Sequence, residues 1–227
     1  MLGARMALFS ERSGSAGNKN DFGLPRLDIE PSRRGPLGPE HAFETTGGFV
    51  ALLYIIWAAN WTLSWLHLDF RHYGIIPRTF WGLLGVLFAP LLHANLAHLM
   101  ANTIPLFVLM SIVLARPVYK GYAAILGIWI LGGLATWALA RGGAVHIGAS
   151  GLIYGMAAYL IAAGFTMMDV MSLVVGLAIA FLYSGLIFGL VPSIFGTTSW
   201  EGHLFGAIAG VLMAFVLHGK AVAGTGG

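Results

Sequence analysis

The sequence places a serine where a nucleophile could act, in the segment HIGASGLIYG at residues 146–155. Ser150 stands between Gly148 and Gly151 at the start of an apolar stretch, and these glycines give the backbone room to turn and to approach a substrate. At the start of a helix, free backbone N–H groups and the positive end of the helix dipole favour developing negative charge. A serine that merely caps a helix has the same sequence signature, so Ser150 alone does not decide between catalysis and structure.

A histidine that could act as the base occurs in the segment WEGHLFG, where a second apolar stretch begins. Three glycines recur every four residues along this stretch and share one helix face: Gly202, Gly206 and Gly210. The stretch that begins at Ser150 carries a matching pair, Gly151 and Gly155. Small residues at this spacing let membrane helices approach closely. We therefore expect the two helices to touch. Ser150 and His203 are each among the first residues of their helices, so they lie at a similar depth if both helices start from the same side of a membrane.

A third group of polar residues lies in the segment HANLAHLMAN at residues 93–102. His98 and Asn102 are four residues apart and share a helix face, which Asn95 joins, and His93 lies just before them. Polar side chains inside a membrane are costly and indicate function. Hydrogen bonding to neighbouring helices is the structural alternative. Two imidazoles and two amides within ten residues favour a functional cluster.

These residue types fit the hydrolysis of a peptide bond through an acyl intermediate. A serine nucleophile needs a base within hydrogen-bond reach and donors for the developing oxyanion. His203 could take the proton of Ser150, while the Ser150 amide and the His98 and Asn102 side chains supply the donors. Glu201 lies two residues before His203, a spacing that points its side chain away from the histidine. The pattern therefore predicts a Ser–His dyad.

The composition is that of an integral membrane protein. Of the 227 residues 58% are hydrophobic and only 9% are charged, whereas soluble domains have about 25% charged residues. The absence of cysteine excludes disulfides, a thiolate nucleophile and a cysteine metal site. The small, dispersed net charge of +3 gives no indication of nucleic-acid binding. No metal or cofactor is expected, since the chain lacks an H-E-x-x-H motif and has few carboxylates in its apolar stretches.

Six stretches approach the roughly 20 apolar residues that a membrane-spanning helix needs. They cover residues 47–66, 91–114, 121–140, 150–167, 172–191 and 202–218. The long, half-apolar link at 67–90 is expected to hold a short helix at the membrane interface. Thr198 and Glu201 have the spacing of a capping box before the last stretch. The sequence therefore predicts an all-α bundle of six transmembrane helices.

The polar regions predict the domain boundaries and the orientation. Residues 1–46 hold six of the twelve Lys and Arg residues and six of the nine Asp and Glu residues, a composition typical of a disordered tail. We expect a core at 47–218 and a short C-terminal tail at 219–227. The basic residues expected on the cytoplasmic side are Arg33, Arg34, Arg116, Lys120 and Lys220, against Arg71, Arg78 and Arg141 outside. This bias and the even number of spans predict that both termini are cytoplasmic.

The remaining polar residues of the apolar region are expected to have structural roles. Asn60, with Trp57 and Trp61 close in sequence, is interpreted as packing or as part of an aromatic belt. His146 and His218 flank apolar stretches, so the simplest interpretation places both at the membrane interface.

Taken in order, HANLAHLMANT, HIGASGLIYG and WEGHLFGAIAG resemble the motifs of the rhomboid family of intramembrane serine proteases, and the resemblance covers about residues 47–218. It implies that Ser150 is the nucleophile and His203 the catalytic histidine, with Tyr154 packed on that histidine. The family pattern H-x4-H-x3-N falls on His93, His98 and Asn102.

The resemblance also implies a six-helix fold with a partly embedded first external loop, and a multi-pass protein of the bacterial inner membrane. The expected partners are lipids and single-pass membrane proteins, which would be cleaved near small residues. The fifth helix and the loop before the sixth would control substrate access. Many members carry a Trp-Arg pair in the first external loop, whereas here Arg78 and Trp81 are separated.

Two other functions fit the sequence less well. A catalytically silent relative that binds or escorts membrane proteins would usually lack the serine or the histidine, and this chain has both Ser150 and His203. A transporter could use the same polar residues as a pathway, but the sequence has neither repeated halves nor paired interrupted helices.

Overall fold

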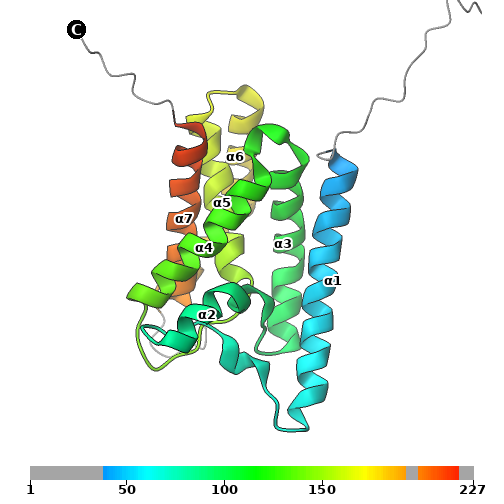
Figure 1. Cartoon of the computed structure of the whole chain (residues 1–227). Coiled ribbons are helices and arrows are strands. Elements are labelled where there is room, and N and C mark those ends of the chain that lie inside the picture. Colours follow the sequence, from blue (N-terminus) through cyan, green and yellow to red (C-terminus); the bar gives the residue numbers. More distant parts are fainter. Residues whose placement is uncertain (1–37, 193–198, 220–227) are drawn as a thin grey trace, which may run out of the picture. The chain divides into compact units, whose positions relative to one another are not determined.

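A computed structural model describes residues 38–192 and 199–219 of the chain, and this part is mostly helical (Figure 1). Six helices form a bundle: α1 (Pro39–Ser64), α3 (Leu96–Ala115), α4 (Gly121–Leu139), α5 (Ser150–Thr166), α6 (Val170–Leu182) and α7 (Trp200–His218). Shorter elements connect them: η1 (Phe70–Tyr73), α2 (Phe80–Phe88), η2 (Ala89–Leu91), η3 (Pro117–Tyr119) and η4 (Ser184–Leu190). The predicted all-α architecture is confirmed.

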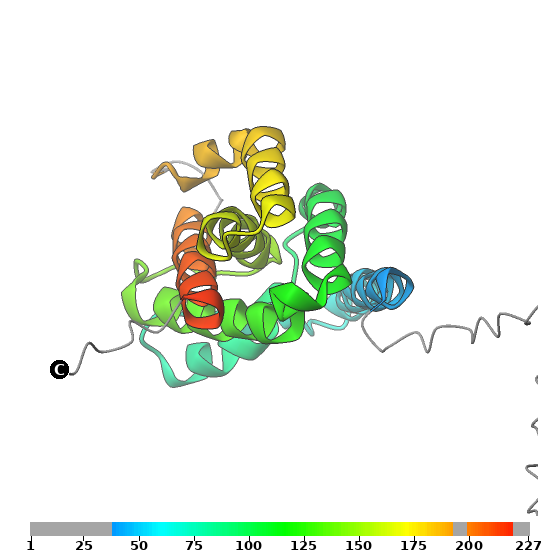
Figure 2. The same ribbon diagram turned by 90° about the horizontal axis from the view of Figure 1, so that it is seen from above.

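The helix α5 lies at the centre of this bundle. It packs against α3, α4, α6 and α7, and the view from above in Figure 2 shows these helices around it, with α1 outside against α3. Most residues of α5 are buried, including the whole run from Leu152 to Ala157. A helix that is apolar on all sides buries itself inside a bundle rather than at its surface. The first residue of α5 is therefore held by neighbours on several sides.

The lengths and exposed surfaces of the helices fit a lipid environment. Within the described residues, four helical segments are long and apolar enough to cross a bilayer, and α6 with η4, bent by 61°, adds a fifth if the pair counts as one span. The central helix α5 is a shorter apolar helix of 17 residues. Large apolar side chains are exposed on the outer helices, for example Ile55 on α1 and Phe181 on α6. The chain is an integral, multi-pass membrane protein.

The core begins earlier than the sequence predicted. The helix α1 starts at Pro39, so the boundary placed at residue 46 falls inside it. Proline in the first turn and Glu40 near the positive end of the helix dipole both favour a helix start there. The rest of the predicted tails, residues 1–37 and 220–227, lies outside the described part of the chain.

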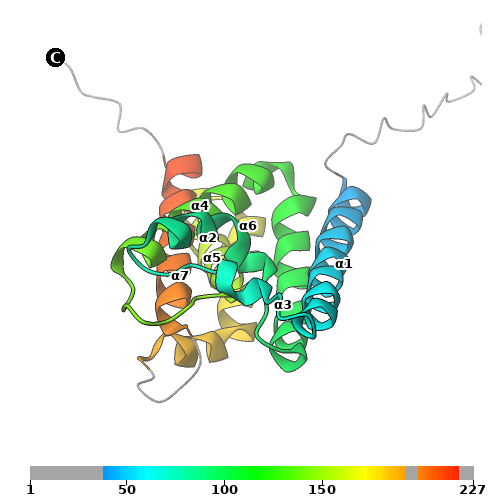
Figure 3. The ribbon, with the colours of Figure 1, turned by 60° about the horizontal axis from the view of Figure 1, so that its bottom comes forward.

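The link between α1 and α3 contains the short helix expected from its sequence. The helix α2 has nine residues, too few to cross a membrane, and packs against α4 (Figure 3). Its N-cap Thr79 accepts a hydrogen bond from the Gly82 amide at 3.0 Å. Asn60, interpreted as a packing residue, accepts a hydrogen bond from the Phe70 amide at 2.6 Å and ties the link to α1. The depth of α2 in the bilayer stays a prediction.

Arg78 anchors this link to the end of α4. The guanidinium Nη1 donates to the carbonyl oxygen of Ala140 at 2.6 Å, and the Arg78 amide donates to the Trp137 carbonyl at 2.9 Å. The Trp137 indole in turn donates to the Thr79 carbonyl at 2.8 Å. Trp81 is 71% exposed and takes no part in these contacts. Of the separated residues Arg78 and Trp81, the arginine therefore anchors the loop to α4, whereas the tryptophan side chain is exposed.

The described ends of the chain lie at one end of the bundle, where α1 begins and α7 ends (Figure 1). Arg116 follows α3 and pairs with Asp169 at 3.2 Å, and Lys120 donates to the Leu217 carbonyl at 2.6 Å. His218 bonds the Tyr159 hydroxyl at 2.7 Å, so it links helices instead of only facing the membrane interface. Lys120, one of the basic residues expected on the cytoplasmic side, thus lies where α7 ends, while the side of the membrane stays a prediction.

Candidate active site

Ser150 is the first residue of α5, and its hydroxyl does not cap the helix. The N-cap position belongs to Ala149, which has no capping side chain. The Ser150 Oγ instead lies 2.9 Å from Nε2 of His203 on α7. Interpreting Ser150 as a plain capping residue is therefore wrong, and the hydroxyl faces a possible base.

The His203 imidazole is held on two further sides. Its Nδ1 lies 2.9 Å from the carbonyl oxygen of Gly189, and the Tyr154 ring stacks on it with centroids 4.1 Å apart and planes within 5°. A carbonyl oxygen can only accept, so Nδ1 carries the proton and Nε2 is left to accept from the Ser150 hydroxyl. The Glu201 carboxylate pairs with Arg141 at 3.1 Å, so a backbone carbonyl orients the histidine.

Glycines bring the two helices together at this point. A Cβ at Gly206 would overlap the carbonyl oxygen of Gly151, and a Cβ at Gly210 would overlap that of Gly155. The backbones of α5 and α7 therefore touch directly, as the two glycine rows predicted. This close approach lets a short serine side chain reach an imidazole on the neighbouring helix.

Residues at the start of α3 support the turn that precedes Ser150. His93 Nε2 accepts a hydrogen bond from the Ala149 amide at 3.4 Å, and its ring lies 5.2 Å from that of His98. Gly148 has φ +115°, and a Cβ there would lie 2.6 Å from Cε1 of His98. Only glycine suits this conformation and this contact. Asn95 caps α3 by accepting from the His98 amide at 2.8 Å, so its side chain serves the helix start.

Asn102 offers a donor with no partner. It lies on α3 one turn beyond His98 and is 6% exposed. Its Nδ2 has no hydrogen-bond partner among the described residues. A buried amide without a partner is destabilising, and such groups concentrate at functional sites.

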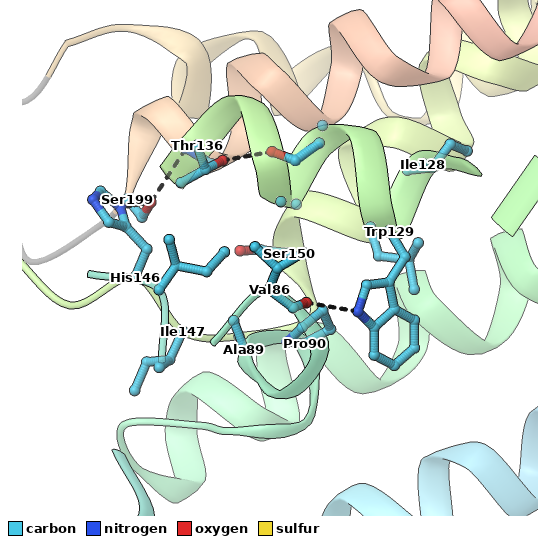
Figure 4. A pocket seen from close by; sticks show the side chains of 18 residues that line it. Val86, Ala89, Pro90, Ile128, Trp129, Thr136, His146, Ile147, Ser150 and Ser199 are labelled. Carbon is cyan, nitrogen blue, oxygen red and sulfur yellow. Dashed lines mark hydrogen bonds between the residues drawn. The ribbon is translucent and has the colours of Figure 1, made fainter. Parts of the chain in front are cut away.

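A cavity of about 50 Å³ adjoins the serine. Figure 4 shows Ser150 in its middle, with Trp129 at one end and His146 and Ser199 at the other. A water molecule needs about 10–15 Å³ of such space and two or more polar partners. The cavity therefore has room for a few water molecules, and hydroxyls and an imidazole line it.

Three residues of this region were not expected from the sequence. Gly189 contributes only its carbonyl oxygen, which no side-chain pattern reveals. His146, expected at the membrane interface, is 4% exposed, and its Nδ1 lies 2.6 Å from the Ser199 hydroxyl. Ser199 is the N-cap of α7, whereas the predicted capping residue Thr198 lies outside the described residues. The sequence feature that could have revealed His146 and Ser199 is their spacing, since His146 lies four residues before Ser150 and Ser199 four residues before His203.

Comparisons with known proteins cover the same region. Residues 77–220 match the Rhomboid domain. An uncharacterized protein of Mycobacterium tuberculosis (strain ATCC 25618 / H37Rv) is 46% identical over 176 residues, which cover 74% of this chain and 72% of that protein. One of Mycobacterium bovis has the same identity and coverage. A third, of Mycobacterium leprae, is 40% identical over 140 residues, or 59% of this chain and 55% of its own length.

Proposed function

Because this chain belongs to the rhomboid family, we propose that it is an intramembrane serine endopeptidase in which Ser150 and His203 form the catalytic dyad. The observation that carries the proposal is the 2.9 Å separation of Ser150 Oγ and His203 Nε2 inside an apolar helix bundle. A buried imidazole bonded to a half-buried hydroxyl between apolar helices is a costly arrangement, and such polar groups inside a membrane protein indicate function.

The reaction follows from the tautomer that the Gly189 carbonyl favours. Ser150 Oγ attacks the carbonyl carbon of the scissile peptide as its proton passes to His203 Nε2. The imidazolium then gives this proton to the leaving amine, the C–N bond breaks, and an acyl-enzyme ester remains. A water molecule attacks the ester with His203 again as base, which frees the new carboxyl group and restores the Ser150 hydroxyl. The cavity beside Ser150 gives that water a place within the bundle.

We assign three donors to the oxyanion that would form on the substrate. The Ser150 amide lies in the first turn of α5, where N–H groups have no partner within the helix. The His98 ring lies against Gly148, and Asn102 has a buried N–H without a partner. Donors that are already in place and have no other partner stabilise a developing charge without reorganisation. This supports His98 and Asn102 as oxyanion-stabilising residues and His93 as a support for the turn.

The Asn102→Ala variant tests this assignment. We expect kcat for a membrane substrate to fall about 10- to 1,000-fold, the loss that follows removal of one oxyanion donor. The protein should melt at or above the wild-type temperature, because the variant also removes an unsatisfied buried amide. Ser111→Ala, at another buried polar residue of α3, is the control and should leave kcat unchanged. An unchanged kcat in Asn102→Ala would remove this residue from the oxyanion site.

The proposed substrates are single-pass membrane segments cut near small residues. An open apolar groove between α3 and α6 supports lateral access, and Val108 and Ile112 face Val175 and Ile179 across it. The helical path is broken by a bend of 61° between α6 and η4, and we propose that α6 can move at this break. We propose that α6 and the segment before α7 control access, and that the protein works in the bacterial inner membrane with both termini in the cytoplasm.

Reconstitution tests the proposed function. The full chain in liposomes would be given a panel of single-pass proteins whose membrane segments carry small residues, and mass spectrometry would locate any cut. We expect two fragments cut within or next to the membrane segment, and none with His203→Ala. If folded protein binds these segments without cutting any of them, it is a silent escort protein and the proposed function is wrong.

A further inference from the structure

A second serine–histidine pair lies beside the proposed dyad, outside the chemistry described so far. His146 Nδ1 is 2.6 Å from Ser199 Oγ, and the same hydroxyl accepts from the Gly202 amide at 3.2 Å. Next to this pair, Glu201 is 3% exposed and forms an ion pair with Arg141. Buried polar clusters of this kind fix the arrangement of the elements that they join.

His146 is fixed on its own side of the contact. Its amide donates to the Ile75 carbonyl at 2.9 Å, and its carbonyl accepts from the Ile75 amide at 3.0 Å. This antiparallel bridge ties the histidine to the link between α1 and α3, which Arg78 anchors to α4. The imidazole therefore projects from a segment whose backbone is held by hydrogen bonds, only four residues before Ser150.

Ser199 holds the other side of the contact, at the start of α7. Its hydroxyl caps the helix, and its carbonyl accepts a hydrogen bond from the His203 amide at 3.2 Å. The serine thus belongs to the same helical turn as the proposed base. His146 lies four residues before Ser150, and Ser199 lies four residues before His203. The His146–Ser199 pair therefore joins the same two chain segments as the proposed dyad, four residues earlier in each.

Burial of the imidazole lowers the pKa of His146 below its usual value, although the nearby Glu201 carboxylate and the Arg141 backbone act in the opposite direction. The ring is therefore neutral at pH 7. Ser199 already accepts from Gly202, so its hydroxyl can donate to the His146 Nδ1 lone pair. The hydrogen bond with Ser199 therefore needs an acceptor at the position of Nδ1. Nε2, on the opposite side of the ring, has no hydrogen-bond partner among the described residues.

We infer that His146 and Ser199 are positioning residues that set the distance between Ser150 and His203. Their hydrogen bond locks the segment leading into α5 to the first turn of α7, and the Glu201–Arg141 pair ties the same turn to the segment after α4. Loss of the bond lets the start of α7 shift while the glycine contacts further along keep the helices packed. A displacement of about 1 Å is enough to slow catalysis roughly 100-fold. The inference rests on the proposed function, since it assigns these residues a role in activating Ser150.

The rate constant for labelling by a fluorophosphonate probe tests this inference without any membrane substrate. The full-length protein in detergent would be compared as wild type, His146→Ala, Ser199→Ala and the double variant. We expect each single variant to react about 10- to 100-fold more slowly. The double variant should be no slower than the slower single variant, because both substitutions remove the same His146–Ser199 hydrogen bond. With a membrane substrate in liposomes, kcat should fall in proportion while KM stays within about twofold, as expected for groups that act after binding.

Two conservative variants separate positioning from plain stability. Asparagine can place its Oδ1 near the Nδ1 position, so His146→Asn should restore labelling to within about threefold of wild type. Glutamine reaches the far side of the ring instead, so His146→Gln should label as slowly as His146→Ala. Melting temperatures would be measured for all variants, and the Asn and Gln proteins remain comparable if the alanine variants do not fold.

Equal slowing by Asn and Gln, additive losses in the double variant, or unchanged labelling of all variants would each overturn the inference. Wild-type protein that is folded and does not label would instead overturn the proposed function, and the positioning role with it. If the wild type and the His146 and Ser199 variants all label at the same rate, the assignment of the dyad stands and only the positioning role of His146 and Ser199 is contradicted.

Discussion

The Ser150→Ala variant will keep its fold and lose cleavage of a membrane substrate by about 10⁴-fold or more, as expected when a nucleophile is removed from a serine hydrolase. The change removes a single oxygen atom and its hydrogen bond to His203. A lost hydrogen bond costs about 1 kcal/mol, which shifts melting by about 2–4 °C in a protein of this size. Cleavage in liposomes and melting in detergent measure the two effects separately.

Ser111→Ala is the matched control, because it makes the same chemical change at a buried serine on α3. It should cleave at the wild-type rate. Cleavage by Ser150→Ala within tenfold of wild type would contradict the assignment of the nucleophile. A large loss of melting temperature in Ser150→Ala would attribute the lost activity to unfolding.

The second large effect is expected from Gly206→Leu, which should lower both stability and activity. A side chain at this position runs into the Gly151 carbonyl on α5 and lies close to Gly132 on α4. Overpacking of this kind costs about 1–3 kcal/mol or more, equivalent to a fall in melting temperature of roughly 3–10 °C. The forced separation of α5 and α7 also moves His203 from Ser150, so cleavage should fall at least about 100-fold.

Gly47→Leu provides the comparison for this change. It makes the same substitution in α1, where a Cβ would have nothing within 4 Å. This variant should melt and cleave like the wild type. Equal melting temperatures for Gly206→Leu and Gly47→Leu would contradict the conclusion that the glycine contacts hold the two helices together.

The features that could be predicted from the sequence are those that show a periodic spacing or that place polar residues in apolar stretches, where they are energetically costly. Glycines every four residues can serve only a close helix contact in a membrane, so the pairing of α5 with α7 followed from their spacing. Ser150 and His203 each lie in the first turn of an apolar helix beside such glycines, and the structure brings their side chains together. The cluster of His93, His98 and Asn102 was visible because polar groups are rare in apolar stretches.

Other features carry no such signal. The partner of His203 Nδ1 is the carbonyl of Gly189, and every residue has a carbonyl, so the sequence could not single it out. The pair formed by His146 and Ser199 joins two segments far apart in the chain, and each residue alone suits a surface position. The helix α1 extends to Pro39 because its first turn is polar yet well suited to a helix start, whereas the prediction relied on apolar composition.

The most direct test of the Ser150–His203 dyad is the mapping of a fluorophosphonate adduct on the full-length protein in detergent. Mass spectrometry should find the adduct on Ser150 in the wild type, and none in Ser150→Ala or His203→Ala. Ser111→Ala should carry it on Ser150 at the wild-type rate. An adduct at another residue, or equal labelling of the His203→Ala variant, would contradict activation of Ser150 by His203.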